Sequence, residues 1–130
     1  MQRMVNCASA ASDVYRAVST VLGRERFWAE SAPESGGVIS FVLADGRTDE
    51  SPIEQAVQDR VYQLRHFGQT LTFTLAPTPT GGTDLTLAAP DGGVDSGVLV
   101  SLLLRLKAFV DFGVDLRNHD PRRTTSYADS

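Results

Sequence analysis

The segment RVYQLRHF, residues 60–67, places two side chains with reactive polar atoms on one face of a predicted strand. Side chains alternate between the two faces of a strand, so Tyr62, Leu64 and His66 point the same way. If that face is buried, a phenol and an imidazole project into an apolar interior. A few polar groups in an apolar pocket are typical of a ligand site, and a histidine there can titrate near neutral pH.

The opposite assignment of this strand is also open. It would bury Gln63, Arg65 and Phe67 and leave His66 at the surface, and a period of two makes the assignments mutually exclusive. We favour the first because it hides Leu64 and exposes Arg65. A lone histidine is usually structural, so a ligand role for His66 is a default hypothesis.

Other residues capable of chemistry lack partners at a suitable spacing. Cys7 is the only cysteine, so it cannot form an internal disulfide, and no base or zinc cluster accompanies it. No GxSxG elbow for a serine nucleophile is present. We interpret the glycines of PTPTGGTD and APDGG as turn residues and not as phosphate-binding loops. We therefore assign no catalytic residue, no metal and no cofactor.

The composition is typical of a soluble globular protein, with 130 residues of which 42% are hydrophobic and 22% charged. A net charge of −4 gives no electrostatic support for nucleic-acid binding. The longest uncharged apolar run, residues 97–104, is far shorter than the roughly 20 residues of a membrane-spanning helix. The N-terminus lacks the apolar segment of a signal peptide, and with one cysteine we expect a cytoplasmic protein.

The first third of the chain predicts a strand and two short helices. Residues 3–8 are a candidate first strand, although its β character is weak. Ser12 is a candidate N-cap, and apolar residues at helical spacing follow it. Gly23 interrupts this pattern, and residues 24–30, RERFWAE, predict a second short helix.

The middle of the chain predicts consecutive antiparallel strands joined by short turns. The clearest is TLTFTLA, where Leu71, Phe73 and Leu75 alternate with threonines. With the candidate first strand, about six strands are expected. The five in this region cover residues 36–46, 52–58, 60–67, 70–76 and 83–89.

Residues 97–118 predict one long amphipathic helix, which Pro121 stops. Its apolar face carries Leu99, Leu102, Leu103, Leu106, Phe109, Val110 and Gly113. The opposite face carries Arg105, Lys107, Asp111, Asp115 and Asn118. Strands followed by a helix indicate an α+β fold in which this helix covers the sheet. We expect one domain over residues 1–120 and a polar tail over residues 121–130.

Several strings resemble the START-like superfamily, also called SRPBCC. They are ASDVYRAVS with RERFWAE, GGVISFVLADG, LTFTLAPTPTGGTDLTLA and LKAFVDFGVDLRNHDP. The nearest branch is the bacterial proteins named after the homologue of the heat-shock-protein-90 ATPase activator. The resemblance covers most of the chain, and it departs at Leu99 and near Thr124 or Thr125, where that branch often carries tryptophan.

The resemblance implies a helix-grip fold, in which a curved antiparallel sheet wraps around the C-terminal helix. It also implies an apolar cavity between sheet and helix. We predict that residues from both sides bind the ligand: Trp28, Phe41, Tyr62, His66, Phe73, Leu103, Leu106 and Phe109. Trp28 could equally seal the core, as aromatic residues bury large areas whatever their function.

Three functions remain open at this stage. The first is binding of a small apolar or amphipathic ligand in that cavity. The second is a cyclase or hydrolase that uses His66 or Tyr62 as acid or base, which requires two titratable groups to converge there. The third is a protein-interaction module, with the chain a monomer or a homodimer, which predicts an exposed apolar patch.

Overall fold

The computed structural model describes residues 1–116 of the chain, which form seven strands and three helices. One strand precedes the two short helices, six strands follow them, and a long helix comes last. This is the α+β order predicted from the sequence. The elements are β1 Gln2–Cys7, α1 Ala11–Ser19, α2 Val21–Phe27, β2 Glu34–Ser35, β3 Val38–Val42, β4 Thr48–Val57, β5 Val61–His66, β6 Gln69–Pro77, β7 Thr83–Ala88 and α3 Ser96–Phe112.

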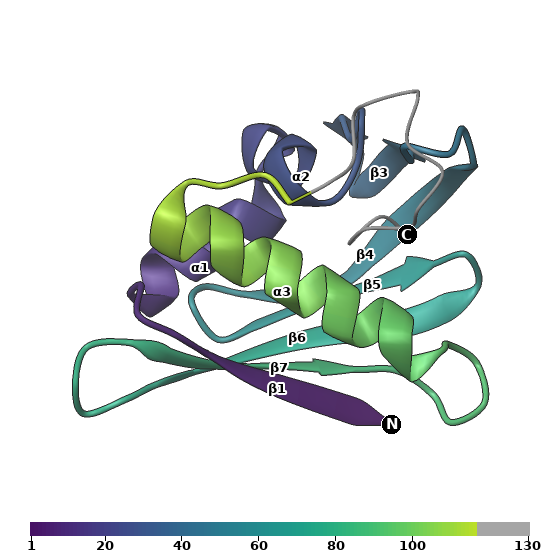
Figure 1. Cartoon of the computed structure of the whole chain (residues 1–130). Helices are drawn as coiled ribbons and strands as arrows, with labels where there is room; N and C mark the ends of the chain where they lie inside the picture. The colour runs from purple at the N-terminus through teal and green to yellow at the C-terminus, as the bar shows by residue number, and fades with distance from the viewer. Residues whose placement is uncertain (117–130) are drawn as a thin grey trace.

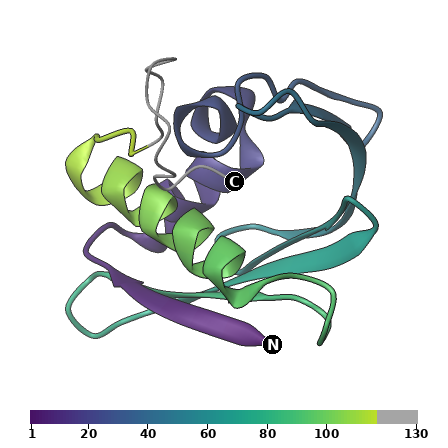
Figure 2. The same ribbon diagram turned by 45° about the vertical axis from the view of Figure 1, so that its right-hand side comes forward.

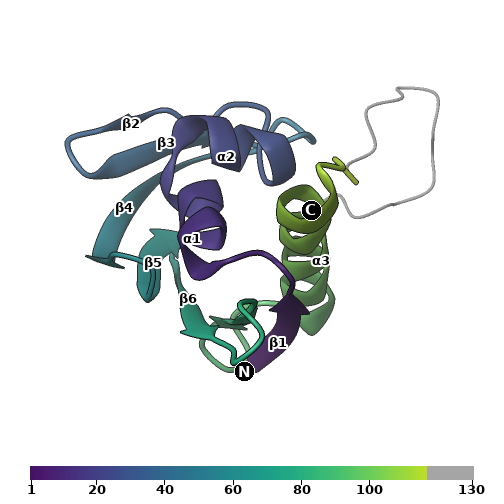
Figure 3. The ribbon, with the colours of Figure 1, turned by 90° about the vertical axis from the view of Figure 1, so that its left-hand side faces the viewer.

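The seven strands form one antiparallel sheet in the order β1-β7-β6-β5-β4-β3-β2. The sheet is curved, and all three helices lie on its concave side (Figure 3). We expected about six strands, and the additional one is β2, two residues that pair with β3. β1 pairs with β7 along its whole length despite its weak β character, because the register is set by the partner strand.

The C-terminal helix covers mainly one half of the sheet. α3 packs along β1 and β7, whereas α1 packs on β5 and β6 (Figures 1 and 2). Both short helices also contact α3. One apolar core fills the space between these layers, and alternate residues of the central strands point into it: Tyr62, Leu64, Leu71, Phe73, Leu75, Leu85 and Leu87.

The first short helix begins earlier than predicted. Its N-cap is Ala10, which makes no side-chain hydrogen bond, and Ser12 already lies inside the helix. The reason is that the backbone N–H groups of Asp13 and Val14 both donate to the Ala10 carbonyl. The expected cap at Ser12 is therefore wrong by two residues.

Gly23 lies within α2 and does not separate the helices, and α2 ends at Phe27 rather than at Glu30. A Cβ atom on Gly23 would lie 2.3 Å from the backbone oxygen of Ala17 in α1. The glycine thus permits a close crossing of the two helices. The hydroxyl oxygen of Thr20 accepts a hydrogen bond from the Gly23 N–H and caps α2.

The long helix is shorter than the predicted span of residues 97–118. Gly113 adopts the left-handed conformation (φ 67°), its N–H donates to the Phe109 carbonyl, and the Val114 N–H donates to the Ala108 carbonyl. The bond from Gly113 to Phe109, made by a residue in the left-handed conformation, is the αL motif that ends helices, and it favours glycine. The predicted end at Asn118, the stop at Pro121 and the tail over residues 121–130 lie outside the described residues.

The polar side of α3 is less exposed than predicted. Arg105 is buried, with 1% of its surface exposed, and its Nε–H donates to the Ser101 carbonyl at 3.4 Å. The Asp111 side chain is also 1% exposed. The reason is that β1, α1 and α2 all contact this helix, so more of its circumference is covered than by a sheet alone.

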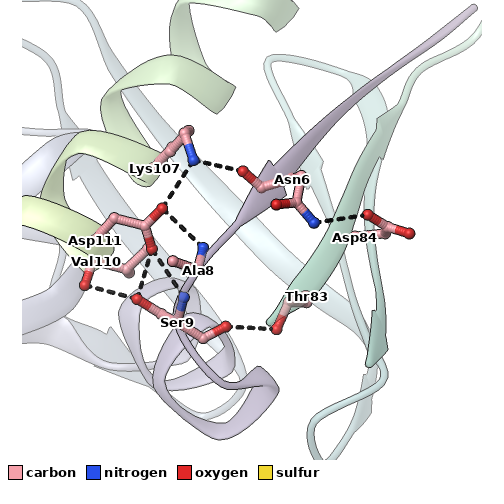
Figure 4. A network of polar contacts seen from close by, with 8 residues as sticks. All are labelled: Asn6, Ala8, Ser9, Thr83, Asp84, Lys107, Val110 and Asp111. Atoms are coloured by element: carbon pink, nitrogen blue, oxygen red, sulfur yellow. Dashed lines mark hydrogen bonds and ion pairs between the residues drawn. The ribbon is translucent and has the colours of Figure 1, made fainter. Parts of the chain in front are cut away.

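Asp111 joins α3 to the junction between β1 and α1 (Figure 4). Its carboxylate accepts hydrogen bonds from the Ala8 N–H at 2.9 Å, the Ser9 N–H at 3.0 Å and the Ser9 hydroxyl at 2.6 Å. The ammonium group of Lys107 lies 2.9 Å away and also donates to the Asn6 carbonyl. A buried carboxylate with this many donors holds both segments in place.

The same contacts explain the acidity of Asp111. Burial alone would raise the pKa of this carboxyl. The hydrogen bonds from Ser9, from Lys107 and from the Ala8 amide outweigh burial and lower the pKa to about 2. A lowered pKa stabilises the folded state above pH 4, and this contribution is lost as the pH falls towards 2.

We predict that Asp111→Asn lowers the free energy of unfolding by about 2 kcal/mol at pH 7, because the amide loses the ion pair and presents donors to donors. Urea denaturation measures the change. The matched control is Asp84→Asn, since Asp84 accepts a single hydrogen bond from Asn6 at an exposed site. It should cost less than about 0.5 kcal/mol. Equal effects of both substitutions would contradict an anchoring role for Asp111.

Candidate functional site

A cavity of about 280 Å³ lies between the inner face of the sheet and the first turns of α3. The end of α2, the β3–β4 turn, the β5–β6 hairpin and the loop before α3 complete its walls. The residues that line it are Trp28, Leu43, Arg47, His66, Phe67, Gln69, Leu71, Gly93, Val94, Asp95, Val98, Leu99 and Leu102. The lining is thus mostly apolar, with four polar side chains, as ligand pockets commonly are.

Aromatic rings enclose His66 at one end of this cavity. Its imidazole centroid lies 5.1 Å from the Trp28 ring, 4.5 Å from Phe41 and 4.7 Å from Phe67, each in edge-to-face geometry. Trp28 also packs against Phe73 at 5.7 Å. The sole tryptophan of the chain therefore contacts both the core and the cavity.

The other side of the imidazole meets two polar residues of β4. His66 Nδ1 lies 2.9 Å from Ser51 Oγ, and Ser51 Oγ lies 2.6 Å from Asp49 Oδ2. The backbone N–H of Phe67 donates to the same Asp49 oxygen. Ser51 is fully buried, so it connects histidine and carboxylate out of reach of solvent.

His66 is neutral at physiological pH. Burial among the rings disfavours the imidazolium and lowers the pKa to about 4, with a smaller contribution from Arg47. The carboxylate of Asp49 acts in the opposite direction, but it lies 3.9 Å from Nδ1 with Ser51 in contact with both. Burial has the larger effect, because only 11% of the His66 side chain is exposed.

The predicted inward face of β5 is confirmed. Tyr62 and Leu64 are buried and His66 is nearly so, whereas more than half of the Arg65 side chain is exposed. Only the last of the three inward residues reaches the cavity, because the cavity lies at the end of the strand. Tyr62 lies four residues before His66 on the same face of β5, and its ring packs against the ring of Tyr15.

The Tyr62 hydroxyl belongs to a different buried group. Burial raises its pKa to about 12, although the nearby Arg24 guanidinium favours the ionised form. Arg24 is itself fully buried, donates to the carbonyls of Val18 and Ala32, and pairs with Glu34 at 3.7 Å. No hydrogen bond of good geometry reaches the Tyr62 hydroxyl from the described residues. The phenol therefore does not converge with His66.

The predicted ligand residues divide into three groups. Trp28 and His66 line the cavity, and Phe41 stands directly behind them. Phe109 lines another hollow, which lies between α1, α2 and α3. The remaining predicted residues, which belong to the packed core, are Tyr62, Phe73, Leu103 and Leu106.

Residues from the first turns of α3 line the cavity, whereas the sequence predicted ligand contacts from the middle of this helix. Leu99 and Leu102 line it from the apolar face, and Val98 lines it from the partly exposed side. The reason is that α3 packs directly on β1 and β7 farther along its length. Leu103 and Leu106 therefore contact protein and do not line the hollow.

Sequence reasoning also missed Asp49, Ser51 and Arg47. In β4, Val57 pairs with Val61, and strict continuation would place Pro52 opposite His66. A bulge between Ile53 and Gln55 shifts the pairing by one residue, so that Ser51 faces His66. Because a bulge leaves no clear mark in a single sequence, the alternation pattern gave no signal for this contact.

The second hollow is a groove of about 690 Å³ between α1, α2 and the C-terminal part of α3. It is larger, but its charged residues Asp13, Arg16 and Arg26 are exposed to solvent. Exposed charges bind weakly and select poorly. The smaller cavity is the better candidate site, because a nearly buried histidine lines it.

Residues 1–116 contain neither a metal-binding cluster nor a membrane-spanning helix. That part of the chain holds no group of three or more His, Cys, Asp or Glu side chains that could bind a metal ion. Its helices are too short or too polar to cross a bilayer.

Comparison with known proteins identifies the fold. No family model and no curated relative match the chain. Among solved structures, protein SSP2350 from Staphylococcus saprophyticus is 17% identical, with a TM-score of 0.72 over 90% of this chain and 96% of its own. The Aha1 dimer from Colwellia psychrerythraea is 15% identical, with a TM-score of 0.71 over 87% and 96%.

A third structure is DynU16, a protein of the dynemicin biosynthetic locus. It is 16% identical, with a TM-score of 0.68 over 95% of this chain and 57% of its own. At these identities the likeness shows a shared fold. The curved antiparallel sheet with a C-terminal helix, consistent with the helix-grip arrangement, is therefore the architecture of this chain.

We predict that the low pKa of His66 makes the protein less stable in mild acid. From pH 6.5 down to pH 4 the unfolded chain binds a proton at this residue that the folded chain does not. The free energy of unfolding should therefore fall by about 2 kcal/mol between pH 7 and pH 4.5 through this group. Urea denaturation of wild type and His66→Gln at both pH values measures it.

The matched substitution is His119→Gln, which changes the only other histidine and so separates its contribution from that of His66. His66→Gln should show a flatter dependence than wild type and His119→Gln. Parallel profiles for all three proteins would contradict the neutral, buried state of His66.

Proposed function

We propose that this protein is a cytoplasmic START-like domain that binds a small apolar or amphipathic molecule in the cavity between the sheet and α3. The observation that carries the proposal is a hollow of about 280 Å³ beside a core of buried apolar side chains. Ligand pockets typically begin near 300 Å³, and protein interiors contain few voids of that size. The ligand is therefore small, of the order of ten to fifteen non-hydrogen atoms.

Chemistry of the lining supports the same conclusion. Apolar side chains from α2, the β5–β6 hairpin and α3 surround the hollow, and burial of apolar surface would drive binding. The resemblance of the sequence to START-like proteins points in the same direction. One structural neighbour comes from a biosynthetic locus, which agrees with a small organic ligand.

A cyclase or hydrolase is less well supported. Acid–base catalysis requires two titratable groups that reach one substrate. Tyr62 does not line the cavity, and Arg47 and Asp95, which do, are bonded to Asp45 and to the Gly97 N–H. Among the described residues that line the cavity, His66 is the one titratable group without such a bond at its cavity end, and this favours binding over catalysis.

Homodimerisation is a second candidate, favoured by a separate observation. Leu22 and Phe112 are 73% and 72% exposed; Leu22 lines the groove between α1, α2 and α3, and Phe112 follows the lining residues Phe109 and Val110 along α3. Large apolar side chains gathered beside a hollow are typical of interaction surfaces. A structural neighbour is itself described as a dimer, so the second copy of this chain is the partner we consider.

We predict that butylbenzene binds in the cavity and changes the fluorescence of Trp28 in a saturable way, because this is the only tryptophan and it lines the hollow. Val98→Phe should weaken binding at least about tenfold by filling the space. The matched control is Val100→Phe, on the same helix, 38% exposed against 41% for Val98, and outside the cavity lining. Equal affinities of the two variants, or no saturable change in wild type, would contradict the proposal.

If the groove is a dimer interface, wild type should dimerise with rising concentration, and Leu22→Asp should shift it to the monomer. Sedimentation velocity measures both. Met4→Asp is the control, because Met4 is 65% exposed on β1 at the opposite side of α3. A monomeric wild type at all concentrations rules this candidate out and leaves ligand binding untouched.

A further inference from the structure

Asp49, Ser51 and His66 form a chain of hydrogen bonds, and the number of available protons determines which atom donates in each bond. Ser51 Oγ carries one proton and contacts two partners, Asp49 Oδ2 at 2.6 Å and His66 Nδ1 at 2.9 Å. A hydroxyl donates preferentially to a carboxylate, because charge-assisted hydrogen bonds are shorter and stronger. The serine proton therefore points to Asp49.

With its proton committed, Ser51 Oγ can only accept from the imidazole. His66 Nδ1 must then carry the hydrogen, and in a neutral imidazole the other nitrogen, Nε2, carries a lone pair. Asp49 is held in place by the backbone N–H of Phe67, so the chain is anchored at its far end. β4 thus fixes both the orientation of the ring and its tautomer.

Nε2 remains as an acceptor without a donor. Within residues 1–116, no group donates a hydrogen bond to it, and the ring lines the cavity. A ligand that fills the largely apolar hollow would displace water from Nε2, and an acceptor buried in this way is costly to leave unpaired. The ligand is the group available to satisfy it.

The other polar groups of the lining do not compete for this role. Arg47 is bonded to Asp45 at 2.7 Å and lies 5.3 Å above the Phe67 ring, and Asp95 caps α3. Gln69 lies opposite His66 on β6. Its side-chain amide can both donate and accept a hydrogen bond, so it does not discriminate between donor and acceptor groups of a ligand. The cavity holds one fixed polar requirement, and it is for a donor.

We infer that the cavity selects molecules with a neutral hydroxyl group on a small apolar body, of the phenol or alcohol class, and that Nε2 of His66 accepts the hydroxyl proton. Asp49 and Ser51 are positioning residues for this contact. The inference rests on the proposed binding function and adds the polar group that the ligand must carry. Anionic ligands are disfavoured, because the Nε2 lone pair repels a carboxylate.

Four matched probes test the inference by isothermal titration calorimetry at pH 7: 4-propylphenol, 4-propylanisole, propylbenzene and 4-propylbenzoate. 4-Propylphenol should bind about fivefold more tightly than 4-propylanisole, as expected for one hydrogen bond. His66→Phe should remove this preference and retain binding of propylbenzene.

The probes separate the inference from the function on which it rests. Equal affinities of wild type for 4-propylphenol and 4-propylanisole, or tightest binding of 4-propylbenzoate, would overturn the selectivity and leave apolar binding intact. Failure of all four to bind would overturn both.

The tautomer is measured without any ligand. Long-range ¹H–¹⁵N correlation spectra of wild type, with His119→Gln used to assign the signals, should show His66 protonated at Nδ1 and bare at Nε2. Ser51→Ala should move the ring to a mixture of tautomers and reduce the preference for 4-propylphenol. A proton on Nε2 in wild type, or an unchanged Nδ1–H in Ser51→Ala, would overturn the role assigned to Ser51.

Discussion

The attachment of α3 through Asp111 is the contact on which the rest of the arrangement depends. It fixes the C-terminal half of the helix to the segment between β1 and α1, while Lys107 adds a bond to the edge of the sheet. A helix anchored at that end and packed on β1 and β7 does not lie flat on the whole concave surface. Its first turns therefore cover a hollow. Farther along, the side chains of the helix contact the sheet directly.

In that hollow, His66 is expected to affect both the pH dependence of folding stability and the binding of a ligand. Rings on three sides favour the neutral form of His66, which predicts a less stable fold in mild acid and, on the inference above, supplies the acceptor for the ligand. A charged imidazole would lose this acceptor. The two residues of β4 that orient the ring are structural in the empty protein, and they acquire a part in recognition only through Nε2. Polar groups in a core are commonly retained for such specificity.

Local patterns predicted what depends on one segment at a time. A period of two identified the inward face of β5 with His66, and a period of about 3.6 identified the apolar face of α3. Contacts that join distant segments escaped prediction: Asp111 meets Ala8 across 103 positions, and Ser51 meets His66 only because β4 contains a bulge. The same limit explains why Leu103 and Leu106 were expected at the cavity in place of Leu99 and Leu102. Periodicity gives the face of a helix, but the turn that lies over a void is set by packing along its whole length.

The most direct test of the account is a crystal structure of the protein grown with 4-propylphenol. The account predicts density for one molecule between Trp28, Leu99 and His66, with its hydroxyl oxygen within hydrogen-bond distance of Nε2. Density only in the groove beside Leu22, or a cavity filled by ordered water at the same probe concentration, would contradict it.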